Sequence, residues 1–212
     1  MSLSETIDKC LIIFTRYPEP GITKTRLIPA LGAVGAATLQ RQMTEYVLAQ
    51  AQLLQSIERV GVQVRFAGGN KQLMQNWLGN NIECLPQGEG DLGQKMANSL
   101  ISAFQTQIKS AVIIGSDCPG LTPLLIAKAF QQLHQGNDLV LGSAIDGGYY
   151  LIGINRFIPQ LFASISWGSD RVFLQTVAIA KSLNLATAYL PPLADVDRPE
   201  DLPIWEQTQK EC

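Results

Sequence analysis

Short apolar runs alternate along this chain with longer segments that are rich in helix-forming residues. Residues 10–14 are a continuous apolar run of the kind that forms a central strand covered on both faces. Residues 31–56 are rich in Ala, Leu and Gln and contain no proline, which predicts a long helix. Similar patterns predict strands at 60–67, 82–85, 111–115 and 187–190, helices at 71–78, 92–109, 122–135 and 170–183, and a last helix after Pro199.

The alternation of strands and helices predicts βαβ units and a mostly parallel sheet. One place breaks the rhythm, because the apolar runs 138–144 and 149–154 are joined only by residues 145–148. So short a connection leaves no room for a crossover helix, and we expect one antiparallel or kinked strand there. The expected fold class is α/β, a three-layer α/β/α arrangement with a mixed sheet, in a single domain that covers residues 1–212.

Composition narrows the range of partners. The net charge is -2 and only 16% of the residues are charged, so no global basic field would draw the chain to nucleic acid or to an anionic membrane. No apolar stretch approaches the ~20 residues that span a bilayer. The opening Met-Ser-Leu-Ser-Glu, followed by Asp8 and Lys9, is too short and too acidic for a secretory signal, and we expect a cytoplasmic protein.

The cysteines and the single histidine limit the chemistry. Cys10, Cys84, Cys118 and Cys212 stand far apart, and His134 is the only histidine. The absence of a Cys-x-x-Cys pair argues against a zinc site, and the lone histidine argues against a histidine base. The simplest interpretation of the four separate cysteines is that they are reduced thiols in a cytosolic protein. A homodimer is compatible with the sequence, which does not fix the oligomeric state.

A loop with three cations follows the first strand. Arg16, Lys24 and Arg26 are balanced by a single acid, Glu19, and Gly21 permits a turn that a side chain would block. Such a loop suits a pyrophosphate, because backbone N–H groups and fixed positive charge both meet its oxygens. The alternative is a solvated surface loop, since the segment is neither G-x-G-x-x-G nor a Walker sequence.

Asp117 stands directly after an apolar run, in the sequence VIIGSDCP of residues 112–119. The carboxyl edge of the sheet is where open α/β proteins bind ligands. A turn or capping residue is the alternative, but Thr122 and Pro123 already supply a cap and a first helical residue. An oxygen ligand beside a cationic phosphate loop would hold Mg²⁺ or Mn²⁺, which takes the rest of its shell from waters and phosphates. We therefore expect Asp117 to be a metal ligand.

Asp195 and Asp197 flank Val196 and could provide a second carboxylate. In an extended segment both side chains would point to the same side. The sequence DRPED, which begins at Asp197, is equally a sound helix start, with an early proline and acids in the first turn. The sequence favours neither of these two interpretations over the other.

The sequence Asp146-Gly147-Gly148 can be a tight hairpin turn and nothing more. In the functional alternative, the two glycines let a bulky substrate lie close to the main chain, while Asp146 accepts a hydroxyl or acts as a base. Tyr149 and Tyr150 would point to opposite faces, so that one is a wall residue and the other a core residue.

Other glycines and one aromatic residue are further candidates. Gly88, Gly90 and Gly93 admit a flexible turn or a close approach to a flat nucleotide base, and the turn is the commoner role. Trp167 is a candidate for the wall of an acceptor pocket, although an aromatic side chain is more often part of a core.

Taken together and in order, five motifs resemble those of a known family. They are Lys24-Thr25-Arg26-Leu27 after Pro20-Gly21, Asp91-Leu92-Gly93, Ser116-Asp117-Cys118-Pro119, the sequence DGGYYLIG of residues 146–153, and Asp195-Val196-Asp197. Over nearly the whole chain they resemble small bacterial proteins of the nucleotide-diphospho-sugar transferase superfamily that are classed as glycosyltransferases, some of them associated with arsenosugar biosynthesis. The pattern is also similar to phospholactate guanylyltransferase.

The resemblance implies a Rossmann-like GT-A fold, a nucleotide-linked donor and a divalent cation. Carried over by position, it implies that Lys24 and Arg26 hold donor phosphates. It also implies that Asp117 ligates the metal and that Asp197 is the late metal-binding residue. The glycine pair 147–148 would lie by the acceptor or the transferred group.

The chain departs from the wider superfamily at two points. Ser116-Asp117-Cys118 stands where many glycosyltransferases have Asp-x-Asp, and Thr15-Arg16 stands where most sugar nucleotidyltransferases have Gly-Gly-x-Gly. The first hypothesis is a metal-dependent glycosyltransferase that uses a nucleotide-sugar, a small acceptor and Asp146 as a base. The second is a nucleotidyltransferase that uses a nucleoside triphosphate and a small phosphorylated acceptor. The third is a nucleotide-binding module without chemistry.

Overall fold

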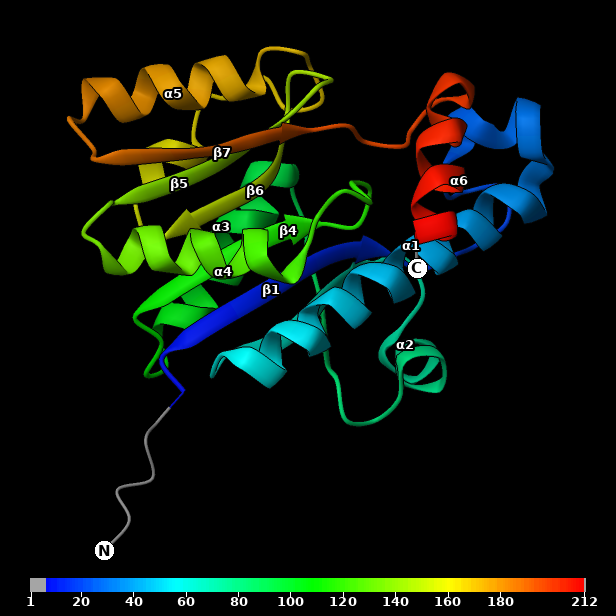
Figure 1. Cartoon of the computed structure of the whole chain (residues 1–212), viewed down its shortest axis with the longest axis horizontal. Coiled ribbons are helices and arrows are strands. Elements are labelled where there is room, and N and C mark those ends of the chain that lie inside the picture. The colour runs from blue at the N-terminus through cyan, green and yellow to red at the C-terminus, as the bar shows by residue number, and fades with distance from the viewer. Residues whose placement is uncertain (1–6, 212) are drawn as a thin grey trace, which may run out of the picture.

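A seven-stranded sheet forms the centre of the structure, a computed structural model that describes residues 7–211 (Figure 1). Its strand order is β3-β2-β1-β4-β6-β5-β7. Among these strands only β6 runs against the others, and it pairs antiparallel with both β4 and β5. The strands are β1 (Lys9–Arg16), β2 (Gly61–Ala67), β3 (Glu83–Pro86), β4 (Ser110–Gly115), β5 (Leu139–Ala144), β6 (Tyr149–Ile154) and β7 (Thr187–Leu193).

Helices cover both faces of the sheet (Figure 1). They are α1 (Ile28–Ile57), α2 (Lys71–Leu78), α3 (Leu92–Phe104), α4 (Pro123–His134), α5 (Val172–Ser182) and α6 (Leu202–Glu211). Side chains of β1 alternate between two cores: Leu11 and Ile13 pack on the side of α1, α2 and α4, and Ile12 and Phe14 pack on the side of α3 and α5. Burial on both faces explains the continuous apolar run. The predicted three-layer α/β/α class with a mostly parallel mixed sheet is confirmed.

The predicted break in the parallel pattern is also confirmed. Strand β6 follows β5 after four residues and pairs with it antiparallel, from Leu139 opposite Ile154 to Ser143 opposite Tyr149. β6 therefore lies between β4 and β5, and its first residues start at the edge where β4 and β5 end.

Two helix boundaries differ from the prediction. The helix predicted at 92–109 is too long, because α3 ends at Phe104 and residues 105–109 form the connection to β4. The long first helix starts at Ile28 instead of residue 31, and Gly32 interrupts it with φ 71° and ψ 168°. Glycine adopts these angles at little cost because it has no Cβ.

Two other boundaries follow the expected chemistry. Pro123 is the first residue of α4, and Thr122 Oγ1 caps the helix by accepting from the Leu125 N–H at 3.3 Å, as predicted. The strand predicted at 187–190 continues through Pro191 and Pro192 in β7. β7 is an edge strand, where a missing N–H on the open side costs no ladder bond, and its register with β5 shifts between Gly142 and Ala144, opposite the two prolines.

A third, smaller cluster joins α6 to the first turns of α1. Leu27, Leu39 and Met43 pack there with Val196 and Trp205. Figure 1 shows α6 beside the start of α1, at one end of the molecule. This packing carries the segment between β7 and α6 past the end of β4, where the Val196 N–H donates to the Asp117 carbonyl oxygen at 2.9 Å.

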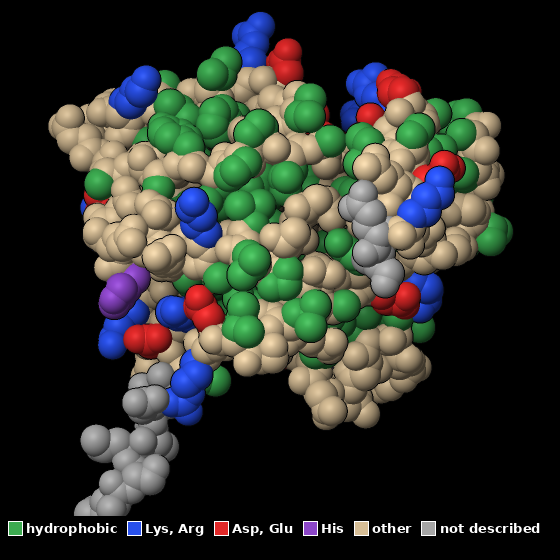
Figure 2. Space-filling view, viewed as in Figure 1, with side chains coloured by type: hydrophobic (Ala, Val, Ile, Leu, Met, Phe, Trp, Pro, Cys, Tyr) green, Lys and Arg blue, Asp and Glu red, His purple; other side chains and the backbone are tan. Residues whose placement is uncertain are grey.

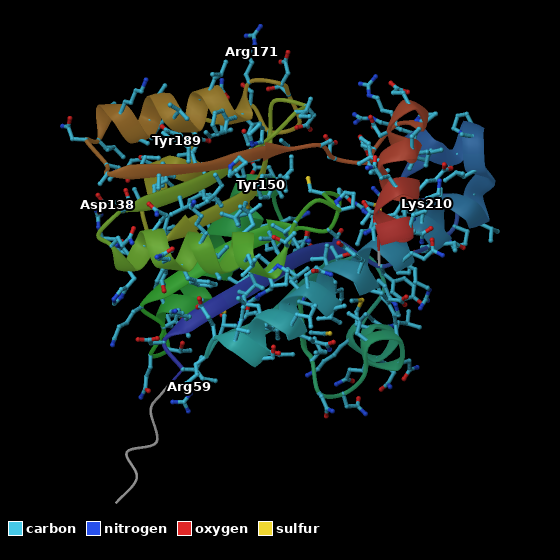
Figure 3. All side chains as sticks on the ribbon, in the orientation of Figure 1. Arg59, Asp138, Tyr150, Arg171, Tyr189 and Lys210 are labelled. Atoms are coloured by element: carbon cyan, nitrogen blue, oxygen red, sulfur yellow. The ribbon has the colours of Figure 1, made fainter. Side chains whose placement is uncertain are left out.

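Hydrophobic side chains are spread over the face formed by α4 and β7, while charged side chains gather near the periphery (Figure 2). Leu124 on α4 and Tyr189 on β7 are exposed. Figure 3 labels Tyr189 on β7. No helix within residues 7–211 combines the length and the hydropathy of a membrane span. Residues 1–6, on which part of the expectation about a secretory signal rests, and Cys212 lie outside the described residues.

Candidate active site

The candidate site lies where several strands end at one edge of the sheet. β1, β4, β5 and β7 run in the same direction, so their carboxyl ends share that edge. Asp117 follows β4, Asp146 follows β5, and Asp195 and Asp197 follow β7. The order β2-β1-β4 makes the crevice between β1 and β4 the switch point at which open α/β sheets bind ligands.

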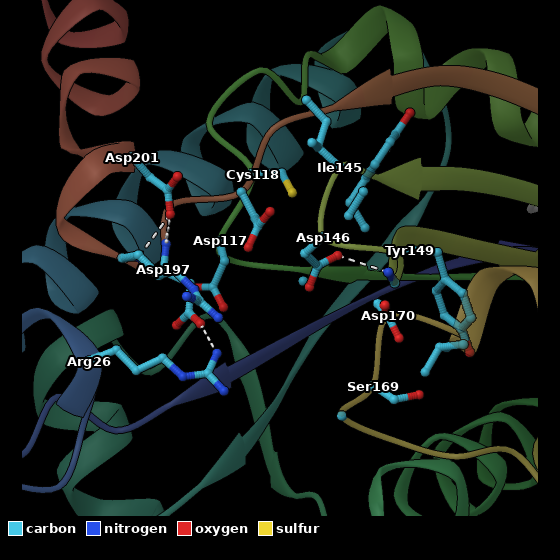
Figure 4. A pocket seen from close by; sticks show the side chains of 18 of the residues that line it. Arg26, Asp117, Cys118, Ile145, Asp146, Tyr149, Ser169, Asp170, Asp197 and Asp201 are labelled. Atoms are coloured by element: carbon cyan, nitrogen blue, oxygen red, sulfur yellow. Dashed lines mark hydrogen bonds and ion pairs between the residues drawn. The ribbon is translucent and has the colours of Figure 1, made fainter.

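A cavity of about 710 Å³ opens at this edge (Figure 4). Its lining brings together residues from six separate parts of the chain. The predicted site residues that line it are Arg26, Asp117, Asp146, Gly148, Tyr149, Trp167 and Asp197, and Asp195 lines it as well. Residues that sequence analysis placed far apart therefore share one open space.

Lys24 does not face this cavity. Its backbone is left-handed, with φ 48°, and its side chain is only 3% exposed. The ammonium lies 2.9 Å from Asp117 Oδ1 and donates to the Val196 carbonyl oxygen at 2.6 Å. Lys24 thus joins the loops that follow β1, β4 and β7. Its charge is paired inside the protein, and the contact of Lys24 with donor phosphates stays a prediction.

Arg26 is the cation of the first loop that lines the cavity. Its side chain is 62% exposed and forms an ion pair with Asp197 (Figure 4). Arg16 and Gly21 are exposed and are not among the lining residues. Of the three loop cations, only Arg26 therefore offers its guanidinium to a ligand in this cavity.

The segment around Asp197 is a helix start, and the side chain of Asp197 also lines the cavity. The Asp201 carboxylate accepts from the backbone N–H groups of Asp197 and Arg198, at 3.1 and 2.8 Å, so the segment is a capped helix start. Because Asp201 does the capping, the carboxylate of Asp197 is not used for it and lines the cavity, where it pairs with Arg26. Asp195 is half-buried, and burial together with nearby Asp146 raises its pKa to about 6.

The two glycines of the turn after β5 have different surroundings. Asp146 Oδ1 accepts from the Gly148 N–H at 2.8 Å, and Gly148 lines the cavity. Gly147 has φ +90°, and a Cβ there would lie 2.2 Å from the carbonyl oxygen of Asp170. Gly147 is therefore packed against the 163–171 loop, and only its neighbour Gly148 borders the open space.

Trp167 and Tyr149 form an aromatic wall of the cavity. Their rings meet edge to face with centroids 6.3 Å apart. Gly93, a candidate for close approach to a nucleotide base, lies beneath Trp167: a Cβ on Gly93 would be 2.3 Å from the indole Nε1. Tyr150 is the core residue of the tyrosine pair, and its hydroxyl donates to the Pro191 carbonyl oxygen at 3.0 Å (Figure 3).

Sequence reasoning missed some lining residues. Asp170 comes from the 163–171 loop, where Ser169 and Asp170 suggest only a helix start. Asp201 was visible only as part of a helix start. Their role as cavity walls depends on how distant loops pack, which no local pattern indicates.

A buried polar network behind Asp117 was also missed. Gln40 Nε2 on α1 lies 3.1 Å from the hydroxyl oxygens of Thr15, Thr44 and Ser116. Thr15 lies near the end of β1 and Ser116 directly follows β4, so the amide ties both strand ends to α1. Nothing in the sequence marks Gln40, because glutamines are frequent throughout that helix.

Carboxylates are the candidate metal ligands at the cavity. Within residues 7–211, no group of three or more His, Cys, Asp or Glu side chains forms a ready-made metal cage. Asp117 and Asp197 nevertheless line the same cavity. Two carboxylates fit Mg²⁺, which usually keeps several waters and takes phosphate oxygens. Cys118 also lines the cavity, but burial raises the pKa of its thiol, and Cys10, Cys84 and Cys118 are all unpaired.

Comparisons with known proteins agree with this architecture. The chain matches the family model described as "Uncharacterized protein conserved in bacteria (DUF2064)" over residues 48–169. It is similar to a solved structure from Desulfovibrio desulfuricans G20, provisionally described as a nucleotide-diphospho-sugar transferase. The identity is 32% and the TM-score 0.89, over 97% of this chain and 89% of that chain. No curated protein matches the chain.

Two more distant solved structures share the fold. The inositol-1-phosphate CTP transferase from T. maritima has 13% identity and a TM-score of 0.61, over 96% of both chains. The glucosyl-3-phosphoglycerate synthase from Mycobacterium tuberculosis, solved with Mg²⁺ and uridine diphosphate, has 14% identity and a TM-score of 0.56, over 92% of this chain and 73% of that chain. The expected Rossmann-like GT-A fold is therefore confirmed.

Proposed function

We propose that this chain, which belongs to the bacterial family DUF2064, is a metal-dependent glycosyltransferase that moves a sugar from a nucleotide-diphospho-sugar to a small acceptor. The observation that carries the proposal is the convergence of Asp117, Asp197 and Arg26 on one cavity at the switch point of the sheet. The likeness to the Desulfovibrio protein over nearly the whole chain supports the same class of donor.

Asp117 and Asp197 would hold the Mg²⁺ or Mn²⁺. When bound, the cation supplies charge stabilisation to the diphosphate that leaves. Lys24 acts on this site indirectly, because its ammonium fixes one oxygen of Asp117 and leaves the half-exposed carboxylate facing the cavity. The M. tuberculosis synthase solved with Mg²⁺ and uridine diphosphate supports a divalent cation in a protein of this fold.

Arg26 would bind the diphosphate of the donor. A guanidinium can grip two phosphate oxygens at once, and that of Arg26 is exposed at the cavity. In the structure it pairs with Asp197, so the donor phosphates would exchange places with this carboxylate. During transfer, Arg26 would offset the negative charge that grows on the leaving nucleoside diphosphate.

The acceptor would lie against Asp146, Tyr149 and Trp167. Asp146 uses Oδ1 to accept from Gly148, which holds the carboxylate in place and leaves its second oxygen available. That oxygen would take the proton of the acceptor hydroxyl as the new bond to the sugar forms. The two aromatic rings would limit the position of the acceptor.

Thermal unfolding with a panel of nucleotides and sugar nucleotides, with and without Mn²⁺, tests the proposal. A ligand at about 100 times its Kd should raise the Tm by about 5–10 °C, and only when metal is present. Asp117→Asn should abolish this shift. The matched control is Asp8→Asn, which removes an exposed carboxylate just before β1, at the opposite edge of the sheet. An unchanged metal-dependent shift and unchanged turnover in Asp117→Asn would remove the central assignment.

The second candidate is a nucleotidyltransferase, which the likeness of the fold to the T. maritima CTP transferase favours. The same carboxylates and Arg26 would then stabilise attack at an α-phosphate. Product analysis separates the two activities. Pyrophosphate released from a triphosphate indicates nucleotidyl transfer, and a free nucleoside diphosphate from a sugar nucleotide indicates glycosyl transfer.

A further inference from the structure

Many more carboxylate side chains line the cavity than a metal site requires. Two guanidinium groups line it, those of Arg26 and Arg198, and Lys24 lies behind it, already paired with Asp117. Seven carboxylates line the same space, those of Asp117, Asp146, Asp170, Asp195, Asp197, Glu200 and Asp201. A single divalent cation would leave this excess of negative charge only partly neutralised, and a bound donor diphosphate would add to it.

Carboxylates lie on both sides of the cavity, but the guanidinium of Arg26 lies on one side. Figure 4 shows Arg26, Asp117 and Asp197 on one side of the pocket, and Asp146 and Asp170 with Tyr149 on the other. No Lys or Arg is among the lining residues of that second side, here called the acidic wall (Asp146, Tyr149, Trp167 and Asp170). Arg171, the nearest cation in sequence, does not line the cavity and points outward (Figure 3).

The acidic wall offers hydrogen-bond acceptors that the protein leaves open. Asp146 uses Oδ1 for the Gly148 N–H, and within residues 7–211 no hydrogen bond or ion pair engages its other oxygen or the carboxylate of Asp170. Carboxylate oxygens accept from hydroxyl groups, and aromatic rings pack against the C–H faces of a polyol or sugar. A phosphate or carboxylate on the acceptor would instead meet like charge with no cation to balance it.

We infer that the acceptor is a polyhydroxyl compound that carries no anionic group, bound through its hydroxyls to Asp146 and Asp170 and through its C–H face to Tyr149 and Trp167. This inference rests on the proposed function. It selects against phosphorylated acceptors, and Asp170 is then a specificity-determining residue with no part in metal or donor binding.

The test compares matched acceptors once a donor has been found by its metal-dependent thermal shift. Glycerol is compared with glycerol 3-phosphate, and glucose with glucose 6-phosphate, by the nucleoside diphosphate released above the rate with water. Each neutral member should be preferred. A phosphorylated member that equals or exceeds its neutral counterpart overturns the inference while donor binding, and the proposed function with it, still stands. Loss of metal-dependent donor binding would instead be a failure of the proposed function.

Two variants make the test specific. Asp170→Lys should reduce the preference for the neutral acceptor about fivefold, and less at high salt, because one repulsive charge becomes attractive. Glu206→Lys is the control: it makes the same charge change at an exposed position of α6 that does not line the cavity, and it should leave the preference unchanged. Equal effects of the two variants contradict a role for the acidic wall.

A second measurement needs no acceptor. The difference in fluorescence between the parent protein and Trp167→Phe isolates Trp167, whose quenching by caesium and by iodide reports the local charge. Each quenching constant is divided by that of the same ion with neutral N-acetyltryptophanamide, because iodide is the more efficient quencher of free indole. This ratio should be higher for caesium than for iodide at Trp167, and Asp170→Lys should reverse the order. A higher ratio for iodide in the parent protein overturns the inference, whatever the turnover experiments give.

Discussion

Lys24 and Arg26 show how two cations that are neighbours in one loop can have opposite roles. Lys24 is buried and bonded to Asp117 and to the backbone of Val196, whereas Arg26 is exposed at the cavity and paired with Asp197. A buried charge that loses its partner is expensive, while an exposed ion pair contributes little. The first residue should therefore govern stability and the second should govern donor binding.

Replacing each cation by methionine tests this division. Lys24→Met should lower the free energy of unfolding by about 1–3 kcal/mol, since it removes hydrogen bonds made by a charged group. Arg26→Met should change it by at most about 1 kcal/mol but should weaken metal-dependent donor binding. Urea unfolding and the nucleotide thermal shift measure the two effects. Similar stability changes in both variants would contradict the structural role of Lys24.

At the scale of elements, the start of α3 and the 163–171 loop form one packed unit. Gly93 lies directly beneath the indole of Trp167, which leaves no space for a Cβ. Trp167 in turn packs edge to face with Tyr149 on β6. The absence of one side chain on α3 thus sets the position of a ring that lines the cavity.

Gly93→Ala should destabilise the protein by about 1–3 kcal/mol, because the added methyl must displace a rigid ring. In a Trp167→Ala background the same change should become neutral or stabilising, since alanine is favoured over glycine in a helix by roughly 0.5–1 kcal/mol. Urea unfolding of the two single variants and the double variant measures this coupling. Additive effects would show that the close contact does not constrain the helix.

For the whole molecule, the concentration of acids at one edge of the sheet affects stability as well as binding. The pKa of Asp195 is raised from 3.8 to about 6, first by burial and then by Asp146. Between these two values an unfolded chain has lost the proton that the folded protein still holds. The contribution of this carboxyl to stability is therefore present below pH about 4 and is lost as the pH rises through about 6.

Asp195→Asn should remove this pH dependence. In EDTA, the Tm of the variant relative to the parent should rise by several degrees between pH about 4 and about 6, and should then level off. Melting curves across this range measure the difference. Asp8→Asn provides the comparison, because its exposed ion pair with Lys109 lies away from the acidic edge. A Tm difference that is flat with pH for Asp195→Asn would contradict the raised pKa.

Much of the fold could be predicted because its signals are local. The apolar run 10–14 indicated a strand covered on both faces, and Thr122 with Pro123 marked the start of α4. The predicted boundaries were wrong where tertiary contacts override the local sequence pattern. Residues 105–109 leave the helix to reach β4, and β7 tolerates two prolines because it lies at an edge and its register with β5 shifts there.

Some residues of the candidate site could be predicted from the sequence and others could not. Asp117, Asp146 and Asp197 follow strands whose common direction brings their ends to one edge, so the sequence could place them together. Asp170 reaches the cavity through a loop that has no such rule. Gly93 was a candidate for close approach to a nucleotide base, and the sequence does not show that Trp167 covers it.

The sequence by itself determined the alternation of strands and helices, the one antiparallel strand and the edge where acids gather. These follow from periodicity, from a connection too short for a helix and from the shared direction of parallel strands. Only the tertiary structure decided which cation of the first loop reaches the cavity and which carboxylates remain open to an acceptor. The physical reason is distance along the chain, because the burial of Lys24 depends on Val196, 172 residues away.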